Sequence, residues 1–177
     1  MHPRKSLTPL AAITAGAVAG AVGTVCLDAV HFLRQRRNGG EQDPLKWEFA
    51  AVPTWEDAPA PGQVGKRLIE GFTQRKLPDG SAWLVSTLMH WGYGSQWGAL
   101  YGVLAGSMRA PHAVYGTPFG AVVWISGYVA MPLAGLYEPI WKYDRKTLAV
   151  DLSAHLAYGT GTGVAFWLVS KVLGSKG

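Results

Sequence analysis

The chain has 177 residues and a net charge of +5, with 49% hydrophobic and only 15% charged residues. Soluble domains carry roughly 25% charged residues, so this composition argues against a water-soluble globular domain. The single cysteine, Cys26, excludes an intrachain disulfide and a zinc site built from cysteines. Because Lys and Arg flank apolar runs, we expect the lipid bilayer as a partner and no nucleic acid.

Four apolar stretches follow one another, each long enough to cross a hydrocarbon core of about 30 Å as a helix. They cover residues 9–33, 81–107, 113–137 and 148–171. Backbone polar groups cannot stay unpaired in lipid, so each stretch must be helical. The sequence therefore predicts an all-α, integral membrane four-helix bundle that forms one membrane domain over residues 1–177.

A polar loop, residues 34–80, separates the first two stretches. Within it Val64, Leu68 and Phe72 recur four residues apart, which predicts a short amphipathic interfacial helix over about residues 63–75. Three aromatic residues of the loop are expected to anchor it in the headgroup region. They are Trp47, Phe49 and Trp55.

The distribution of Lys and Arg predicts the orientation. Eleven of them lie in loops 34–80 and 138–147, and five lie in the N-terminus, the second loop and the C-terminus. The positive-inside rule therefore predicts a multi-pass protein with both termini outside and these two loops in the cytoplasm.

The second and fourth stretches share a pattern, since His90–Gly98 reads HWGYGSQWG and His155–Gly163 reads HLAYGTGTG. We interpret the chain as two similar helical hairpins related by a pseudo-two-fold axis. Glycines four residues apart let helices approach closely, so we expect stretches 81–107 and 148–171 to meet face to face. A homodimer through the longer stripe is the alternative. The packing glycines are Gly94, Gly98, Gly102, Gly106, Gly159 and Gly163.

Six ionisable residues are expected near one side of the membrane, and such groups are costly in lipid unless paired or functional. They are Asp28, His31, His90, Glu138, Asp151 and His155. One hypothesis is that they pair to hold the helices together, in a structural or accessory subunit of a larger membrane complex. A second is a small transporter or proton pathway that uses His90, His155 and Asp151.

The third hypothesis is a metal or haem protein. His90, His155, Asp151 and Asp28 are the candidate ligands for a transition metal, and the two histidines are the candidate axial ligands of a haem. The sequence contains no P-loop, HExxH, GxSxG or dinucleotide fingerprint, so no catalytic residue is predicted.

Three segments carry a resemblance to a known group of proteins. They are PGQVGKRL from Pro61, HWGYG from His90 with GALYG ending at Gly102, and WKYD from Trp141 with DLSAHLAYG ending at Gly159. Over roughly residues 45–165 the chain resembles a family of small bacterial membrane proteins and is distantly similar to YagU-like inner-membrane proteins. The resemblance implies a bacterial plasma membrane and assigns no reaction.

Overall fold

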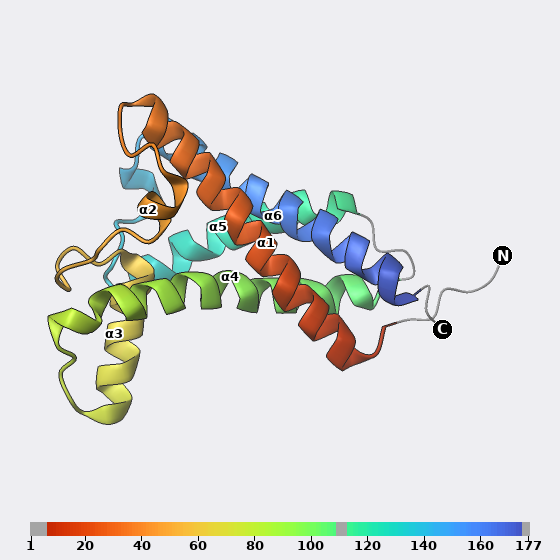
Figure 1. The fold of residues 1–177 in the computed structure, drawn as a ribbon, viewed down its shortest axis with the longest axis horizontal. Helices are drawn as coiled ribbons and strands as arrows, with labels where there is room; N and C mark the ends of the chain where they lie inside the picture. The colour runs from red at the N-terminus through yellow and green to blue at the C-terminus, as the bar shows by residue number, and fades with distance from the viewer. Residues whose placement is uncertain (1–6, 109–112, 175–177) are drawn as a thin grey trace.

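The computed structural model describes residues 7–108 and 113–174, and within them it contains helices and no strand (Figure 1). The helices are α1 Pro9–Arg37, α2 Pro44–Glu48, α3 Ala60–Thr73, α4 Ala82–Gly106, α5 Gly116–Leu133 and α6 Arg145–Gly174. Three short 3₁₀ turns join them, η1 Asp79–Ser81, η2 Ala113–Tyr115 and η3 Ile140–Lys142. The all-helical prediction is confirmed. Four of the basic residues that decide the orientation lie outside the described residues, namely Arg4, Lys5, Arg109 and Lys176.

Local sequence sets where the long helices begin. The Thr8 hydroxyl accepts a hydrogen bond from the Ala11 amide at 3.2 Å, and Pro9 fits the first turn because it lacks an amide proton. The Asp144 carboxylate accepts the amides of Lys146 and Thr147 at 2.9 and 3.0 Å, ahead of α6. Both helices therefore begin at a side chain that satisfies otherwise unpaired amides.

Two segments are long and apolar enough to cross a membrane, α1 and Ala113–Leu133, which comprises η2 and α5. Helices α4 and α6 are long enough, at 25 and 30 residues. Helix α6, however, contains Asp151 and His155, and both helices contain many Gly, Ser, Thr and Tyr residues. Those residue types are close to neutral in hydropathy. Composition thus supports two of the four predicted spans.

The long helices form two hairpins. Helix α1 packs on α4, and helix α5 packs on α6, in both cases through glycines on the two facing helices. A Cβ built on Gly16 would lie 2.8 Å from the Cα of Gly102, and one built on Gly116 would lie 2.8 Å from the Cα of Gly163. Close approach needs small residues on both sides, and α1 and α5 supply them. The prediction that α4 and α6 meet face to face is therefore wrong. Helix α1 covers the α4 stripe, which is the face that the alternative homodimer contact would use.

The two hairpins meet mainly along α1 and α6. Gly161 packs against Cys26, and Gly23 packs against the backbone of Tyr158. The backbones of α4 and α5, by contrast, come close at few positions, and these helices contact each other through aromatic rings, since the Tyr101 and Phe119 ring centroids lie 5.0 Å apart. A two-fold axis relating the hairpins would make the α1–α6 and α4–α5 contacts equal, so the predicted pseudo-symmetry is not present.

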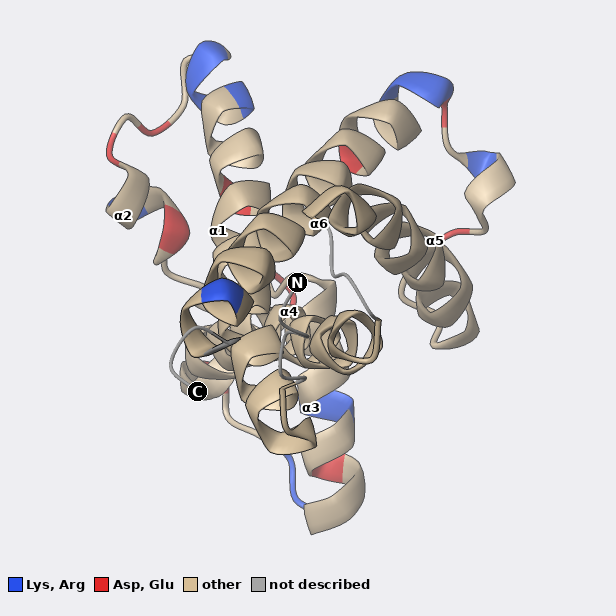
Figure 2. Ribbon diagram, turned by 90° about the vertical axis from the view of Figure 1, so that its right-hand side faces the viewer, with Lys and Arg blue, Asp and Glu red and all other residues tan. Residues whose placement is uncertain are grey.

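Large aliphatic side chains cover the outside of the four long helices. Examples are Val18 and Val25 of α1, Leu88 and Leu104 of α4, Val122 and Val129 of α5, and Leu168 and Val172 of α6. The interior instead holds alanines, glycines, threonines and aromatic rings. Helices α4 and α5 contain no charged residue, and Lys and Arg lie toward the ends of α1 and α6 and in the connecting segments (Figure 2).

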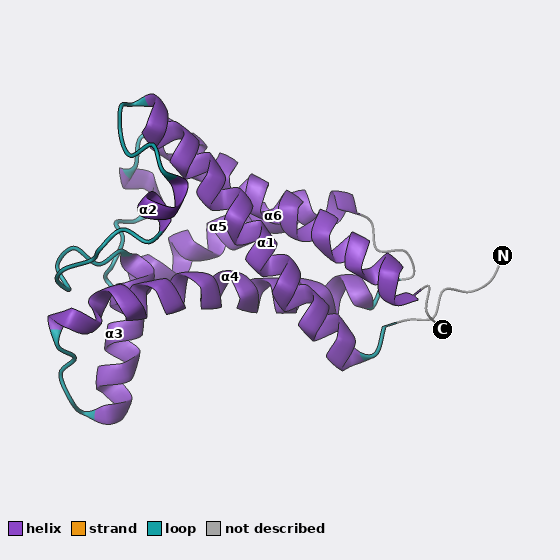
Figure 3. Ribbon diagram, in the orientation of Figure 1, coloured by secondary structure: helices purple, strands orange, loops and turns teal. Residues whose placement is uncertain are grey.

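The connections between α1 and α4 and between α5 and α6 lie at the same end of the bundle (Figure 3). Helix α3 runs across that end, roughly perpendicular to α4, and packs on it through Gly62 and Gly65. The segment expected to be an amphipathic helix is thus helical. Its residues Leu68 and Phe72 are 50% and 87% exposed.

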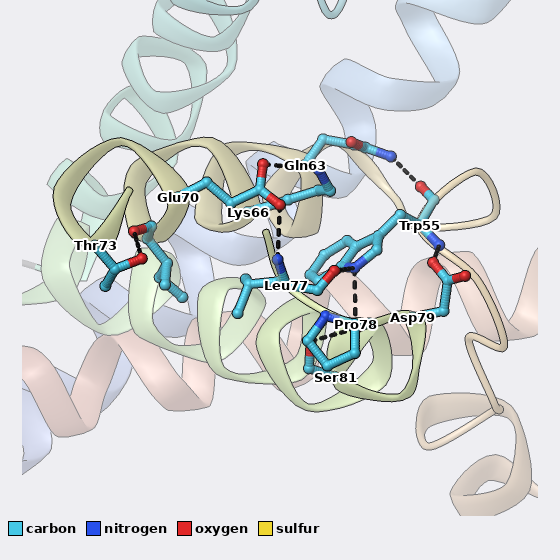
Figure 4. A network of polar contacts seen from close by, with 10 residues as sticks. Trp55, Gln63, Lys66, Glu70, Thr73, Leu77, Pro78, Asp79 and Ser81 are labelled. Carbon is cyan, nitrogen blue, oxygen red and sulfur yellow. Dashed lines mark hydrogen bonds and ion pairs between the residues drawn. The ribbon is translucent and has the colours of Figure 1, made fainter. Parts of the chain in front are cut away.

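Trp55 holds the connection between α2 and α3 in place. It is only 7% exposed, and its indole N–H lies 3.2 Å from the Leu77 carbonyl oxygen and 3.1 Å from that of Pro78 (Figure 4). Its amide donates to Asp79 at 3.2 Å. The expectation that Trp55 anchors the loop in lipid is wrong, because its ring fills a small core beneath the loop.

Polar contacts from α3 complete this arrangement. The Gln63 side-chain amide donates to the Trp55 carbonyl, and the Glu70 carboxylate accepts the Leu77 amide at 2.8 Å. Glu70 also pairs with Lys66 at 2.9 Å. The loop is therefore a folded layer at the end of the bundle.

Candidate functional site

A cavity of about 660 Å³ lies at the end of the bundle where the loops are, between the long helices and the loop layer. Residues of all four long helices and of α3 line it. Five of the six ionisable residues predicted to cluster line this cavity. They are Asp28, His31, His90, Asp151 and His155.

Glu138 does not join them. It follows the end of α5 by several residues and is exposed, and its carboxylate pairs with the Lys142 ammonium at 2.7 Å. The sequence interpretation extended the third span to residue 137. The helix ends at Leu133, just after Pro132, so Glu138 lies in the connecting segment instead.

Asp28 and His90 form the first acid–imidazole pair, between α1 and α4. The Nε2 atom of His90 lies 3.1 and 3.0 Å from the two carboxylate oxygens of Asp28. Asp28 is 9% exposed. A buried carboxylate needs such a partner, because unpaired charge away from water is costly.

Glu48, at the end of α2, is a third member that sequence reasoning missed. Ligand atoms of Asp28, Glu48 and His90 all lie within 4.8 Å of one another. The Trp91 indole N–H donates to Glu48 at 3.1 Å. Burial, and then the nearby Asp28 carboxylate, raise the pKa of Glu48 above the usual glutamate range.

Only tertiary packing brings Glu48 there. Asp43 caps the amides of Leu45 and Lys46 and so begins α2, and the Trp47 ring packs on Phe32 of α1 at 5.7 Å. The sequence signal was the short run from Asp43 to Glu48, a capping residue followed by Pro44. It predicts a helical turn but not its position against α1.

Asp151 and His155 form the second acid–imidazole pair, within α6. The His155 Nδ1 lies 3.0 Å from the Asp151 carbonyl oxygen and 3.4 Å from a carboxylate oxygen. The Trp124 indole N–H donates to the other carboxylate oxygen at 3.1 Å. This carboxylate is 29% exposed, more than twice the 12% of Asp28, so it remains more accessible from the cavity.

The two hairpins differ by one helical turn in register. Gly16 meets Gly98 and Gly102, whereas Gly116 meets Gly159 and Gly163, although Gly98 and Gly163 align in the sequence repeat. The shared histidines therefore take different positions. His90 reaches α1, while the His155 backbone lies against Gly120.

The four metal ligands predicted from the sequence surround one cavity without converging. Among the described residues, the one group of three or more ligand side chains that converges is Asp28, Glu48 and His90. Asp151 and His155 bind each other and Trp124 instead. The sequence interpretation expected Asp151 and His155 to complete a site with Asp28 and His90, whereas in the structure Glu48 is the side chain that converges with them.

The cavity wall is aromatic and acidic. Among the described residues that line it, none is Lys or Arg, and two are aspartates. The nearest basic side chain of α1, Arg34, donates instead to the Val150 carbonyl and the Ser153 hydroxyl of α6. Seven lining residues are aromatic, namely Trp47, Tyr93, Trp97, Trp124, Tyr128, Tyr137 and Tyr158.

This arrangement can bind a small molecule with an apolar body and a positive charge. Aromatic faces attract cations, and the two carboxylates supply the opposite charge. Searches with the chain found no matching family model, no matching curated protein and no matching solved structure.

Proposed function

We propose that the protein is a four-span bacterial plasma-membrane protein that binds and transports a small organic cation in the cavity between α4 and α5. The observation that carries this proposal is the composition of the cavity wall, where the described residues include seven aromatic residues, two aspartates and no Lys or Arg. Of the three functions expected from the sequence, transport accounts for this cavity best. Residues that only hold helices together need no open space between them.

The outside of the bundle supports the membrane part of the proposal. Monomeric soluble proteins rarely expose contiguous apolar patches larger than a few hundred Å². Here every long helix exposes valines and leucines while it buries glycine, alanine and threonine. Lipid tails are a suitable surrounding for such an apolar exterior. Helices α4 and α6 can also span the membrane when their polar faces turn toward the inside of the bundle.

We propose that both termini lie outside and that the loop layer with the cavity mouth faces the cytoplasm. A cysteine at Gln42 in a Cys26→Ser background should react with a membrane-impermeant maleimide only after the cells are opened. A cysteine at Ser107 should react in intact cells. The reverse pattern would invert the orientation without affecting the four spans.

The binding test uses two probes of the same shape and opposite charge, tetraphenylphosphonium and tetraphenylborate. Binding to the detergent-purified chain is followed by quenching of tryptophan fluorescence, since Trp97 and Trp124 lie in the wall. We expect the cation to bind at least tenfold more tightly, a difference of about 1.4 kcal/mol. Equal binding of both ions would leave an apolar pocket without charge selectivity and would refute the proposal.

Asp151→Asn should weaken binding of the cation about tenfold and leave binding of the borate unchanged. Glu138→Gln is the matched control, because Glu138 is exposed and lies outside the cavity. Proteoliposomes that contain the wild-type chain should accumulate the cation in response to a pH gradient. If the cation binds but is not taken up, the binding site in the cavity stands and the transport function is refuted.

A further inference from the structure

We infer that Asp28, Glu48 and His90 bind a divalent transition-metal ion at the edge of the cavity. The three side chains come from α1, α2 and α4, which are separate segments of the chain. One ligand atom from each lies within 4.8 Å of the other two, as one ion between them requires. One imidazole and two carboxylates form a donor set that suits zinc, iron or manganese.

The charges of the group also favour a divalent cation. Asp28 is buried and Glu48 is half-buried, so two like charges face each other where water screens them poorly. A divalent ion between the two carboxylates offsets both charges. The site would then be neutral or nearly so within the bundle.

The surrounding contacts orient the ligands. The Trp91 indole holds one Glu48 oxygen at 3.1 Å and leaves the other for an ion. Such contacts to a coordinating carboxylate fix its direction and increase metal affinity. Asp28 and His90 also line the cavity, so water or a bound solute can complete the coordination.

This inference shares Asp28 and His90 with the cavity of the proposed function, whereas Glu48 belongs to the metal site alone. Glu48 is not among the residues that line the cavity, so Glu48→Gln removes a metal ligand without changing the cavity wall. The second acid–imidazole pair is a natural control. Asp151 and His155 lie in the same cavity but have no third convergent ligand among the described residues.

The test is isothermal titration of Zn²⁺, Mn²⁺ and Mg²⁺ into the full-length chain, purified without a histidine tag and stripped with a chelator. We expect one tight site for Zn²⁺ or Mn²⁺ per chain and at least tenfold weaker binding of Mg²⁺. Glu48→Gln and His90→Gln should each weaken the tight site at least tenfold. His155→Gln should leave it unchanged.

Each variant is also tested for thermal stability in the presence of chelator, so that loss of metal is distinguished from loss of fold. If Glu48→Gln folds and binds Zn²⁺ as the wild type does, the inference is wrong. Equal weakening by His155→Gln would also overturn it, because the ion would then bind elsewhere. With chelator present, tetraphenylphosphonium binding by Glu48→Gln should match the wild type, because Glu48 does not line the cavity.

Discussion

Gly20 of α1 and Gly98 of α4 meet backbone to backbone, because a Cβ built on Gly20 would lie 2.8 Å from the Cα of Gly98. No flexible side chain lies between them that could move aside. The separation of the two helices is therefore set at this point. It determines how far Asp28 and His90, farther along the same pair of helices, stand apart.

Gly98→Ala should destabilise the protein by about 1–3 kcal/mol, because the added methyl group meets backbone and forces α1 and α4 apart. Thermal unfolding in detergent measures the change. Gly92→Ala on the same helix is the control, since a Cβ there meets nothing within 4 Å. It should be neutral or stabilise by about 0.5–1 kcal/mol. Equal changes in stability at the two sites would show that helix propensity, and not close packing, determines the effect of the substitutions.

Asp144 should make the start of α6 sensitive to acid. Hydrogen bonds from the Thr147 hydroxyl, and then from the Thr147 and Lys146 amides, hold the pKa of Asp144 below its usual value of 3.8. A carboxyl group with a lowered folded pKa stabilises the fold above its unfolded pKa, and the contribution is lost as pH falls through the folded value.

The measurement is the difference in melting temperature between wild type and Asp144→Asn from pH 7 to pH 3. Asn still caps the helix but does not titrate. The wild type should be more stable at pH 7, and its advantage should shrink as the pH falls below about 4. An advantage that stays constant over this range would contradict the prediction.

Helix α3 should lie in the headgroup region of the bilayer. In a Cys26→Ser background, a nitroxide label attached to a cysteine at Phe72 should be more accessible to oxygen than to a water-soluble nickel complex. Phe72 is 87% exposed on the apolar side of the helix, and we expect such an apolar face to contact lipid. A label at exposed Glu56 in the loop is the control and should show the opposite preference. Nickel accessibility at both sites would place α3 in water.

Trp55→Ala should loosen the loop layer while the bundle persists. The change removes the indole N–H that the Leu77 and Pro78 carbonyls share and leaves a hole in the small core beneath the loop, for a local cost of about 3–5 kcal/mol. Limited proteolysis should cut between Trp55 and Asp79 faster than in the wild type. Trp141→Ala is the control, because Trp141 is 81% exposed and its loss should change nothing.

The sequence predicts the four long helices well because their apolar runs are long and contain few ionisable residues. It also identifies Asp28, His90, Asp151 and His155, since ionisable groups in such runs are conspicuous. It places Glu138 wrongly, because periodicity alone does not show that the helix ends after Pro132.

Helix partners are harder to predict than helices. Glycine spacing shows that a face packs closely, but Gly98 could meet Gly16, Gly163 or a second copy of the chain with equal sequence support. The one-turn shift between hairpins arises from contacts distant in the sequence. The same is true of Glu48, which reaches His90 only because Trp47 packs on α1.

The seam between α1 and α6 has a mechanical consequence. Within the described chain the backbones of the two hairpins meet closely along this seam, while α4 and α5 contact each other through the rings of Trp97, Tyr101 and Phe119. A rotation about this seam would act as a hinge and change the width of the opposite side, where Tyr93 of α4 and Trp124 of α5 line the cavity. Such a rotation would separate the Tyr101 and Phe119 rings and leave the glycine contacts of both hairpins intact.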